Sequence, residues 1–333
     1  MAVGDSITAG FAARSTLFEA RDISWSIGAG SAAQLTLPYL LGRYGDAAKF
    51  LQGMSTKAVL PKDVLHLPKG DWHPATDHLN VAESQASAVH FDSLVEQWGF
   101  LHGALGDARQ YPNLDSRWKV LTVWMTANDV CGAGHECKKP VKASTLDTWT
   151  QRTDALLHNV SATMKRVYVN LVSTLDLSNV HRIQQSRAWC KFEHQHILRE
   201  CGCIDRGDPK ELKQLDANIK TMNDALHGLA AKWHAALAAQ GRTDMAVTVQ
   251  AYQEGVGASL DHTFLNALDC FHPSQRGHED LAIGLWNDML CTGDRKNRCG
   301  RPFANDLAPV CPTADSVFYT GPDVIPNPLP TGA

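Results

Sequence analysis

The sequence lacks several features that would place it in a special class. Its 333 residues contain no dense run of Lys and Arg, and the net charge is −4, so a nucleic-acid partner or a polybasic membrane role is not expected. No apolar stretch approaches the roughly 20 residues that span a bilayer, and there is no internal repeat. What is present is an ordinary globular composition, with 44% hydrophobic and 20% charged residues.

A signal peptide is also missing, although other features indicate the secretory pathway. Nine cysteines are more than a cytosolic enzyme usually carries, and Asn159-Val160-Ser161 is an N-glycosylation acceptor. The alternative is a set of free buried thiols with a chance sequon. We favour a secreted or lumenal glycoprotein in which one cysteine has no partner within the chain. We therefore expect the natural N-terminus and its signal sequence to lie upstream of Met1.

Short apolar runs rich in β-branched residues alternate with helical patterns. The runs after the initial Ala2-Val3 cover 78–84, 118–126, 166–174 and 245–252, and the helical patterns cover about 85–103, 145–164, 209–239 and 275–290. This alternation predicts an α/β fold, a three-layer α/β/α sandwich with a central parallel sheet. We expect one domain over 1–300, with a Cys-rich insertion around 176–208 and a Pro-rich tail over 301–333.

Polar side chains follow the predicted strands, at the point where each strand ends. Ser6 follows the first strand, the turn at 83–85 follows the second and Asn128 follows the third. Asp269 and His272 come after the last strand. Because ligands of parallel α/β sheets bind at the carboxyl ends of the strands, these residues are expected to share one site. A serine, an aspartate and a histidine together are the groups that acyl transfer through a serine ester requires.

Each of these residues has a role in such chemistry. Ser6 would be the nucleophile, His272 its base, and Asp269 the carboxylate that orients the imidazole. Asn128 and the backbone N–H of Ser6 would bind the oxyanion. Simpler alternatives exist for each alone: Ser6 could cap a helix, Asp-x-x-His is a common local hydrogen bond, and Asn-Asp after a strand is usually a turn.

The motifs resemble those of the GDSL, or SGNH, hydrolases. "GDSITAG" (4–10), "TAND" (126–129) and "DCFH" (269–272) are similar to three blocks of that family. The phospholipase B branch is closer still, in "ISWSIGAG" (23–30), "TLPYLL" (36–41), "LNVAES" (79–84), "ANDVC" (127–131), "VYVNLVS" (167–173) and the segment 269–290. The resemblance implies a flavodoxin-like fold and hydrolysis of acyl esters of phospholipids or lysophospholipids, with no metal and no cofactor.

One position departs from the family pattern. The family usually has a glycine after the second strand, and its backbone N–H completes the oxyanion hole with Ser6 and Asn128. Here Gln85 stands at that position. A glutamine still has a backbone N–H, but it fits poorly if the position requires a positive φ. The resemblance therefore leaves two readings open, an active esterase and a catalytically weakened lipid-binding relative.

The cysteines are expected to form disulfides near this site. The candidates are Cys131, Cys137, Cys190, Cys201, Cys203, Cys270, Cys299 and Cys311. Sequence does not give their connectivity; we considered a bridge from Cys270 to Cys201 or Cys203, and a local bridge between Cys131 and Cys137. A zinc site in the 190–203 stretch, which also contains His194 and His196, is the less favoured alternative.

The sequence thus predicts a serine esterase of the phospholipase B type whose partner is a lipid or other acyl ester. An esterase for another small ester, such as an acetylated sugar, is the alternative. The neighbourhoods of Trp25, Phe91, Trp98 and Trp124 could supply an apolar groove for the acyl chain. Because a base must be neutral to act, the rate is expected to fall below about pH 6. The oligomeric state is left open.

Overall fold

A parallel sheet forms the centre of the molecule. The computed structural model describes residues 1–45, 51–59, 72–90, 92–131, 136–256, 259–291 and 303–321. Within them, four parallel strands lie in the order β1 (Ala2–Gly4), β2 (Lys119–Trp124), β3 (Val167–Val172) and β4 (Met245–Gln250). Every residue of β3 is buried, which explains why this strand reads as an almost unbroken apolar run.

The register brings the carboxyl ends of the strands to one edge. Gly4 pairs with Trp124, and Val172 pairs with Gln250 at the end of the last strand. Residues that follow the strands therefore gather at the same edge of the sheet, where ligands of such folds bind.

The segment 78–84, which was predicted to be a strand, is not a regular one. It runs beside β1 but forms only an isolated parallel bridge, between Ala2 and Asn80. On its other side a guanidinium takes the place of a neighbouring strand, because Arg21 donates to the carbonyls of Asn80 and Ala82 at 2.9 and 2.8 Å. Backbone hydrogen bonds join the segment to β1, between Ala2 N–H and Leu79 O at 2.9 Å and between Val81 N–H and Ala2 O at 3.0 Å. Bonding to a side chain replaces ladder pairing only on the outer side.

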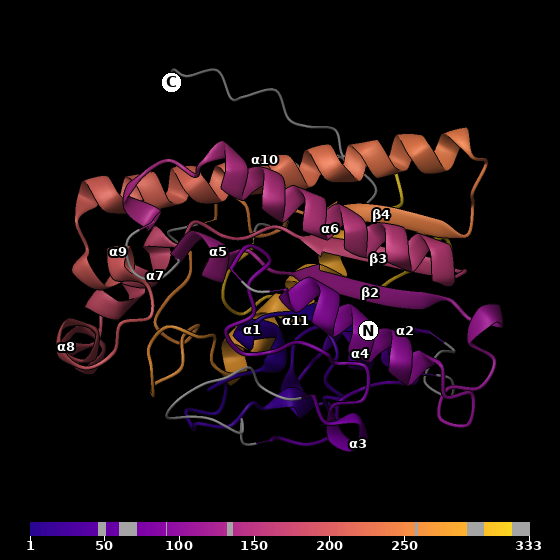
Figure 1. The fold of residues 1–333 in the computed structure, drawn as a ribbon. Coiled ribbons are helices and arrows are strands. Elements are labelled where there is room, and N and C mark those ends of the chain that lie inside the picture. The colour runs from indigo at the N-terminus through magenta and orange to yellow at the C-terminus, as the bar shows by residue number, and fades with distance from the viewer. Residues whose placement is uncertain are drawn as a thin grey trace.

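Helices cover both faces of the sheet (Figure 1). The crossover helices α4, α6 and α10 follow β1, β2 and β3 and pack on one face, whereas α2 and α11 pack together on the other. In a sequential strand order, crossovers that share one hand place their helices on one face of the sheet. The predicted three-layer α/β/α sandwich is confirmed. The helices are α1 (Ser6–Ala9), α2 (Leu37–Tyr44), α3 (Pro74–Asp77), α4 (Ser93–Leu105), α5 (Ala127–Cys131), α6 (Ala143–Thr163), α7 (Ser178–Gln185), α8 (Ala188–His196), α9 (Gly202–Arg206), α10 (Pro209–Ala239) and α11 (Gln275–Met289), with 3-10 turns at Arg21–Ile23, Leu114–Ser116 and Glu136–Lys138.

The long helix α10 begins and ends where its sequence pattern predicts. The Asp208 side chain accepts hydrogen bonds from the backbone N–H groups of Lys210 and Glu211, at 2.8 and 3.1 Å, and Pro209 occupies the first helical position. None of the helices in the described ranges is both long and apolar enough to cross a membrane.

Helix α4 begins at Ser93, about eight residues later than predicted. The residues before it are held in a loop by a buried carboxylate. Asp129 accepts a 2.5 Å hydrogen bond from the Ser87 hydroxyl and a 2.8 Å bond from the backbone N–H of Val89. A turn with positive φ at Gln85 precedes them. These contacts keep this part of the apolar pattern out of the helix.

Candidate active site

Ser6 is the first residue of α1, immediately after β1. The helix is capped by Asp5, whose side chain accepts from the backbone N–H of Ile7 at 3.0 Å, so the alternative in which Ser6 itself caps the helix is wrong. Gly4 permits the tight entry, because a Cβ at this position would lie 2.5 Å from Thr8 Oγ1. The turn therefore leaves the Ser6 side chain at the carboxyl edge of the sheet.

Ser6, His272 and Asp269 form a continuous hydrogen-bonded chain. Ser6 Oγ lies 2.8 Å from His272 Nε2, and His272 Nδ1 lies 2.8 Å from Asp269 Oδ2. All three residues are buried, with exposed fractions of 8%, 5% and 3%. In this arrangement the imidazole can accept the serine proton at one nitrogen while the carboxylate holds the other.

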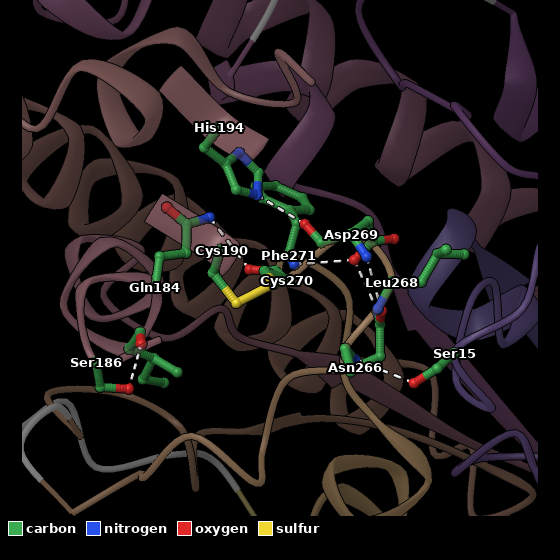
Figure 2. Close-up of a disulfide and its surroundings, with 12 residues drawn as sticks. Ser15, Gln184, Ser186, Cys190, His194, Asn266, Leu268, Asp269, Cys270 and Phe271 are labelled. Carbon is green, nitrogen blue, oxygen red and sulfur yellow. Dashed lines mark hydrogen bonds between the residues drawn. A yellow bond between two sulfur atoms is a disulfide. The ribbon is translucent and has the colours of Figure 1, made fainter. Parts of the chain in front are cut away.

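The loop that carries Asp269 and His272 is organised around the other carboxylate oxygen. Asp269 Oδ1 accepts from the backbone N–H of Phe271 at 2.9 Å and from Asn266 Nδ2 at 2.7 Å (Figure 2). It also accepts from the backbone N–H of His272 at 3.0 Å. Burial raises the pKa of Asp269, but the charge of His272 and these hydrogen bonds outweigh burial and lower the pKa below its usual value. Asp269 is therefore a carboxylate at neutral pH.

His272 is surrounded by negative charge. Burial lowers its pKa, but Asp269, Glu200 and Asp5 outweigh burial and raise the pKa to about 9. The rings of Phe11 and Phe271 lie edge-on to the imidazole, at 5.1 and 5.2 Å between centroids. The site thus stabilises the imidazolium that forms when a serine gives up its proton.

Two further predicted residues lie at the same site. Gln85 and Asn128 line the same cavity as Ser6 and His272. Gln85 has φ = 68°, the left-handed conformation that a glycine adopts easily. Asn128 Nδ2 donates to the carbonyl of Ala86 at 2.9 Å, which ties the two segments together.

The cavity beside Ser6 has a volume of about 320 Å³. Most of its wall is apolar, and Glu193 and Glu200 add carboxylates on one side. Its apolar lining residues are Phe11, Leu17, Leu198, Leu268 and Phe271.

The predicted aromatic groove is wrong. Trp25 and Trp124 are buried in the core, with ring centroids 5.2 Å apart, and Trp98 on α4 packs beside His102. None of these three tryptophans lines the cavity beside Ser6, and Phe91 lies outside the described residues. These tryptophans thus pack in or against the core, and the loops over the sheet edge supply the apolar wall of the cavity instead.

Comparisons with known proteins assign the chain to a family. A profile of the GDSL-like lipase/acylhydrolase family matches residues 1–285. The chain belongs to this family. It is 29% identical over 340 residues to membrane-associated phospholipase B1 of Homo sapiens and 27% identical over 339 residues to that of Rattus norvegicus, in each case over 96% of this chain and 21% of the relative. The chain thus spans about a fifth of the length of these relatives.

Among solved structures, the extracellular lipase of Streptomyces rimosus matches with 11% identity and a TM-score of 0.31, over 85% of this chain and 96% of that one. The family membership supports an ester hydrolase.

The disulfides of this GDSL-family chain differ from the pairs considered from sequence. Cys190 is bonded to Cys270 inside the Asp-x-x-His loop (Figure 2). The other two described bridges are Cys131–Cys201 and Cys137–Cys203. The local bridge is therefore wrong, because Cys131 and Cys137 both pack against the start of α9. Neither Cys201 nor Cys203 reaches Cys270.

Three cysteines lie outside these bridges, Cys291, Cys299 and Cys311. Cys311, a disulfide candidate, is an exposed free thiol 3.7 Å from the Tyr44 hydroxyl. Cys291, which was not a candidate, is disulfide-bonded. Cys299 lies outside the described residues.

The zinc alternative does not fit the 190–203 stretch. Its three cysteines are used in disulfides, so they supply no thiolate ligands. His194 is bound on both ring nitrogens, by Asp205 and by the carbonyl of Asp269, whereas His196 is exposed. No group of three possible metal ligands occurs in the part of the chain that the structure describes.

A buried ion pair supports the segment that leads to Gln85 and was missed from sequence. Arg21, 1% exposed, binds Glu19 at 2.7 Å and also holds the carbonyls of the 80–82 segment. Glu19 in turn accepts from the Ser84 hydroxyl at 2.6 Å, next to Gln85. Nothing in the local pattern distinguishes these charges from ordinary surface residues.

Proposed function

We propose that this chain is a serine esterase of the phospholipase B type, which hydrolyses acyl esters of phospholipids or lysophospholipids. The observation that carries the proposal is the Ser6–His272–Asp269 chain of 2.8 Å contacts at the wall of an apolar cavity. The membrane-associated phospholipase B1 relatives support the same substrate class. Three disulfides and an exposed Asn159 on α6 fit a secreted or lumenal enzyme.

The reaction proceeds in two half-reactions. Ser6 Oγ attacks the acyl carbonyl carbon while His272 Nε2 takes the serine proton, and the backbone N–H groups of Ser6 and Gln85 with the Asn128 amide bind the oxyanion. The carbon–oxygen bond of the ester then breaks, and His272 donates the proton to the leaving alcohol. In the second half, His272 takes a proton from water, the resulting hydroxide attacks the acyl-Ser6 carbonyl, and Ser6 leaves with the proton that His272 returns.

The protein surface near the cavity favours a lipid over a small soluble ester. Leu17, which lines the cavity, and its neighbour Phe18 are 48% and 44% exposed. Helix α8, whose Glu193 lines the cavity, exposes Trp189 and Phe192, each about half exposed, three residues apart on one helical face. We call these four side chains the apolar rim. Large exposed apolar side chains beside a site indicate contact with another apolar surface.

The conformation of Gln85 argues against the weakened, lipid-binding alternative. The position requires a positive φ, and Gln85 adopts it, at 68°. Its backbone N–H is therefore directed as that of a glycine would be, so the replacement leaves the donor in place. The cost of the left-handed conformation, about 1–2 kcal/mol for a residue with a Cβ, falls on stability and not on the chemistry.

A substrate panel tests the proposal. Purified protein and a Ser6→Ala variant are assayed with lysophosphatidylcholine, a diacyl phospholipid in vesicles, p-nitrophenyl acetate and an acetylated sugar. We expect kcat/KM to be highest for the lipid esters, with no turnover by Ser6→Ala. Preference for the acetylated sugar would support the alternative esterase, and the absence of any Ser6-dependent hydrolysis would contradict the proposal.

A further inference from the structure

The 176–208 insertion contacts the loop of Asp269 at three points (Figure 2). Cys190 is bonded to Cys270, Gln184 Nε2 donates to the carbonyl of Cys270 at 3.1 Å, and His194 Nε2 lies 2.6 Å from the carbonyl of Asp269. Two consecutive carbonyls and one side chain of this loop are therefore held by α7 and α8.

The loop needs such support because its backbone is strained. Cys270 has φ = 51°, in the left-handed region that residues with a Cβ avoid. Strained backbone persists where the surrounding structure fixes it from several directions. The Asp269 carbonyl belongs to the peptide unit that joins Asp269 to this strained residue, and its carbon is bonded to the Cα that carries the Asp269 carboxylate.

His194 is itself held in place from its second nitrogen. Its Nδ1 lies 2.8 Å from Asp205 Oδ1, and the residue is only 4% exposed. Both ring nitrogens thus face oxygen acceptors, so both carry a proton when both hydrogen bonds are made. Burial lowers the pKa of His194, but Asp205, the Asp269 carbonyl and the nearby Glu193 outweigh burial and raise it. The charges of Glu200 and His194 also interact.

We propose that His194 is a positioning residue for the proposed hydrolysis: oriented by Asp205, it holds the carbonyl of Asp269 and so keeps the Asp269 carboxylate against His272. It does not line the cavity beside Ser6, and it acts only through Asp269. This inference rests on the proposed function, but its first effect is on the contact between Asp269 and His272, which can be measured without turnover.

The test compares two variants on one helix. His194→Phe keeps a ring but removes both donors, and His196→Phe makes the same change at an exposed position of the same helix. In His194→Phe we expect the pKa of His272, followed by NMR of labelled histidine, to fall by about one unit. We expect kcat on a soluble short-chain ester to fall about 10- to 100-fold with KM unchanged. His196→Phe is expected to match wild type in both measurements.

Two conservative variants separate positioning from simple packing. His194→Gln places an amide near the position of Nε2, where it can donate to the Asp269 carbonyl, whereas His194→Asn places its amide near Nδ1, toward Asp205. We expect Gln to restore most of the His272 pKa and of kcat, and Asn to restore neither. If His194→Phe does not fold, the difference between His194→Gln and His194→Asn tests the positioning role by itself.

The inference is overturned if His194→Phe leaves the His272 pKa and kcat at the values of His196→Phe, or if the Gln variant loses as much as the Asn variant. A wild-type protein that hydrolyses no ester, while its His272 pKa still falls in His194→Phe, would contradict the proposed function and leave the positioning role standing.

Discussion

Ser6 Oγ and His272 Nε2 lie 2.8 Å apart although 266 positions separate the two residues in the chain. They follow β1 and β4, the two outer strands of the four-stranded sheet. With adjacent strands about 4.8 Å apart, the chain after β4 must cross the whole carboxyl edge of the sheet to reach Ser6. This crossing explains why many contacts hold the segment around Asp269. Asn266 binds it from within the loop, and the 176–208 insertion binds it from outside.

The first prediction concerns pH. His272 must be neutral to accept the Ser6 proton, and its pKa is raised to about 9. Protonated imidazole therefore dominates below that value, and kcat/KM on a soluble ester should rise with pH through the neutral range. An imidazole of ordinary pKa predicts that the rate falls below about pH 6. The raised pKa of His272 moves this fall in rate to higher pH. A profile that is flat between pH 6 and 9 would contradict the assignment of His272 as the base.

The second prediction concerns Asp269→Asn. The variant removes the charge that raises the His272 pKa and replaces an acceptor at Nδ1 with an amide. We expect kcat to fall by about 10⁴-fold, the size of the effect of the same change in a serine protease, and the His272 pKa to fall. Asp107→Asn, at an exposed ion pair with Arg109, is the matched control. A loss of less than tenfold in Asp269→Asn would remove this residue from the proposed mechanism.

The third prediction concerns Gln85→Gly. Gly relieves the left-handed strain at φ = 68° but adds entropy to the unfolded chain, so the free energy of unfolding should be unchanged or higher by up to about 1 kcal/mol. Hydrolysis should be equal or faster, since the backbone N–H stays. Gln85→Val, with a β-branched side chain at the same φ, should destabilise the protein. Urea unfolding and kcat measure both; a large loss of activity in Gln85→Gly would show that the glutamine side chain has a role of its own.

Long periodic elements could be predicted well, and elements that depend on side-chain bonding could not. The bounds of α10 follow from Asp208 and Pro209 at its start, and β2, β3 and β4 lie within predicted apolar runs. The segment 78–84 carries the same kind of pattern, but Arg21 binds its outer carbonyls. Every residue has a carbonyl, so no pattern in the sequence marks those that a distant arginine will bind.

The same limit applies to the site. Ser6, Asn128, Asp269 and His272 stand in recognisable motifs, and the structure brings them to one cavity. His194 bonds to a backbone carbonyl 75 positions away, and no motif accompanies it. From sequence, the histidines of this stretch were considered only as part of a Cys-rich insertion and of the less favoured zinc site. Disulfide pairing likewise depends on how α5 and α9 pack, which the spacing of cysteines does not encode.

The fourth prediction concerns the apolar rim. The double variant Trp189→Ser/Phe192→Ser removes its two aromatic side chains on α8, which are about half exposed and absent from the wall of the cavity. We expect weaker binding to phospholipid vesicles in a sedimentation assay and slower hydrolysis of vesicle lipid, with unchanged kcat/KM on a soluble short ester. Val317→Ser, at an exposed apolar side chain of the tail, is the control. Equal loss on both substrates would indicate a damaged site and not a lipid contact.

The nucleophilic role of Ser6 is tested most directly by reaction with a fluorophosphonate, followed by peptide mapping of the labelled folded protein. A single modified residue at Ser6 is expected, with labelling abolished in Ser6→Ala and strongly slowed in His272→Ala, because only the serine held 2.8 Å from the imidazole is activated. Label on another residue, or no label on protein whose circular dichroism matches wild type, would contradict the role of Ser6 as the nucleophile.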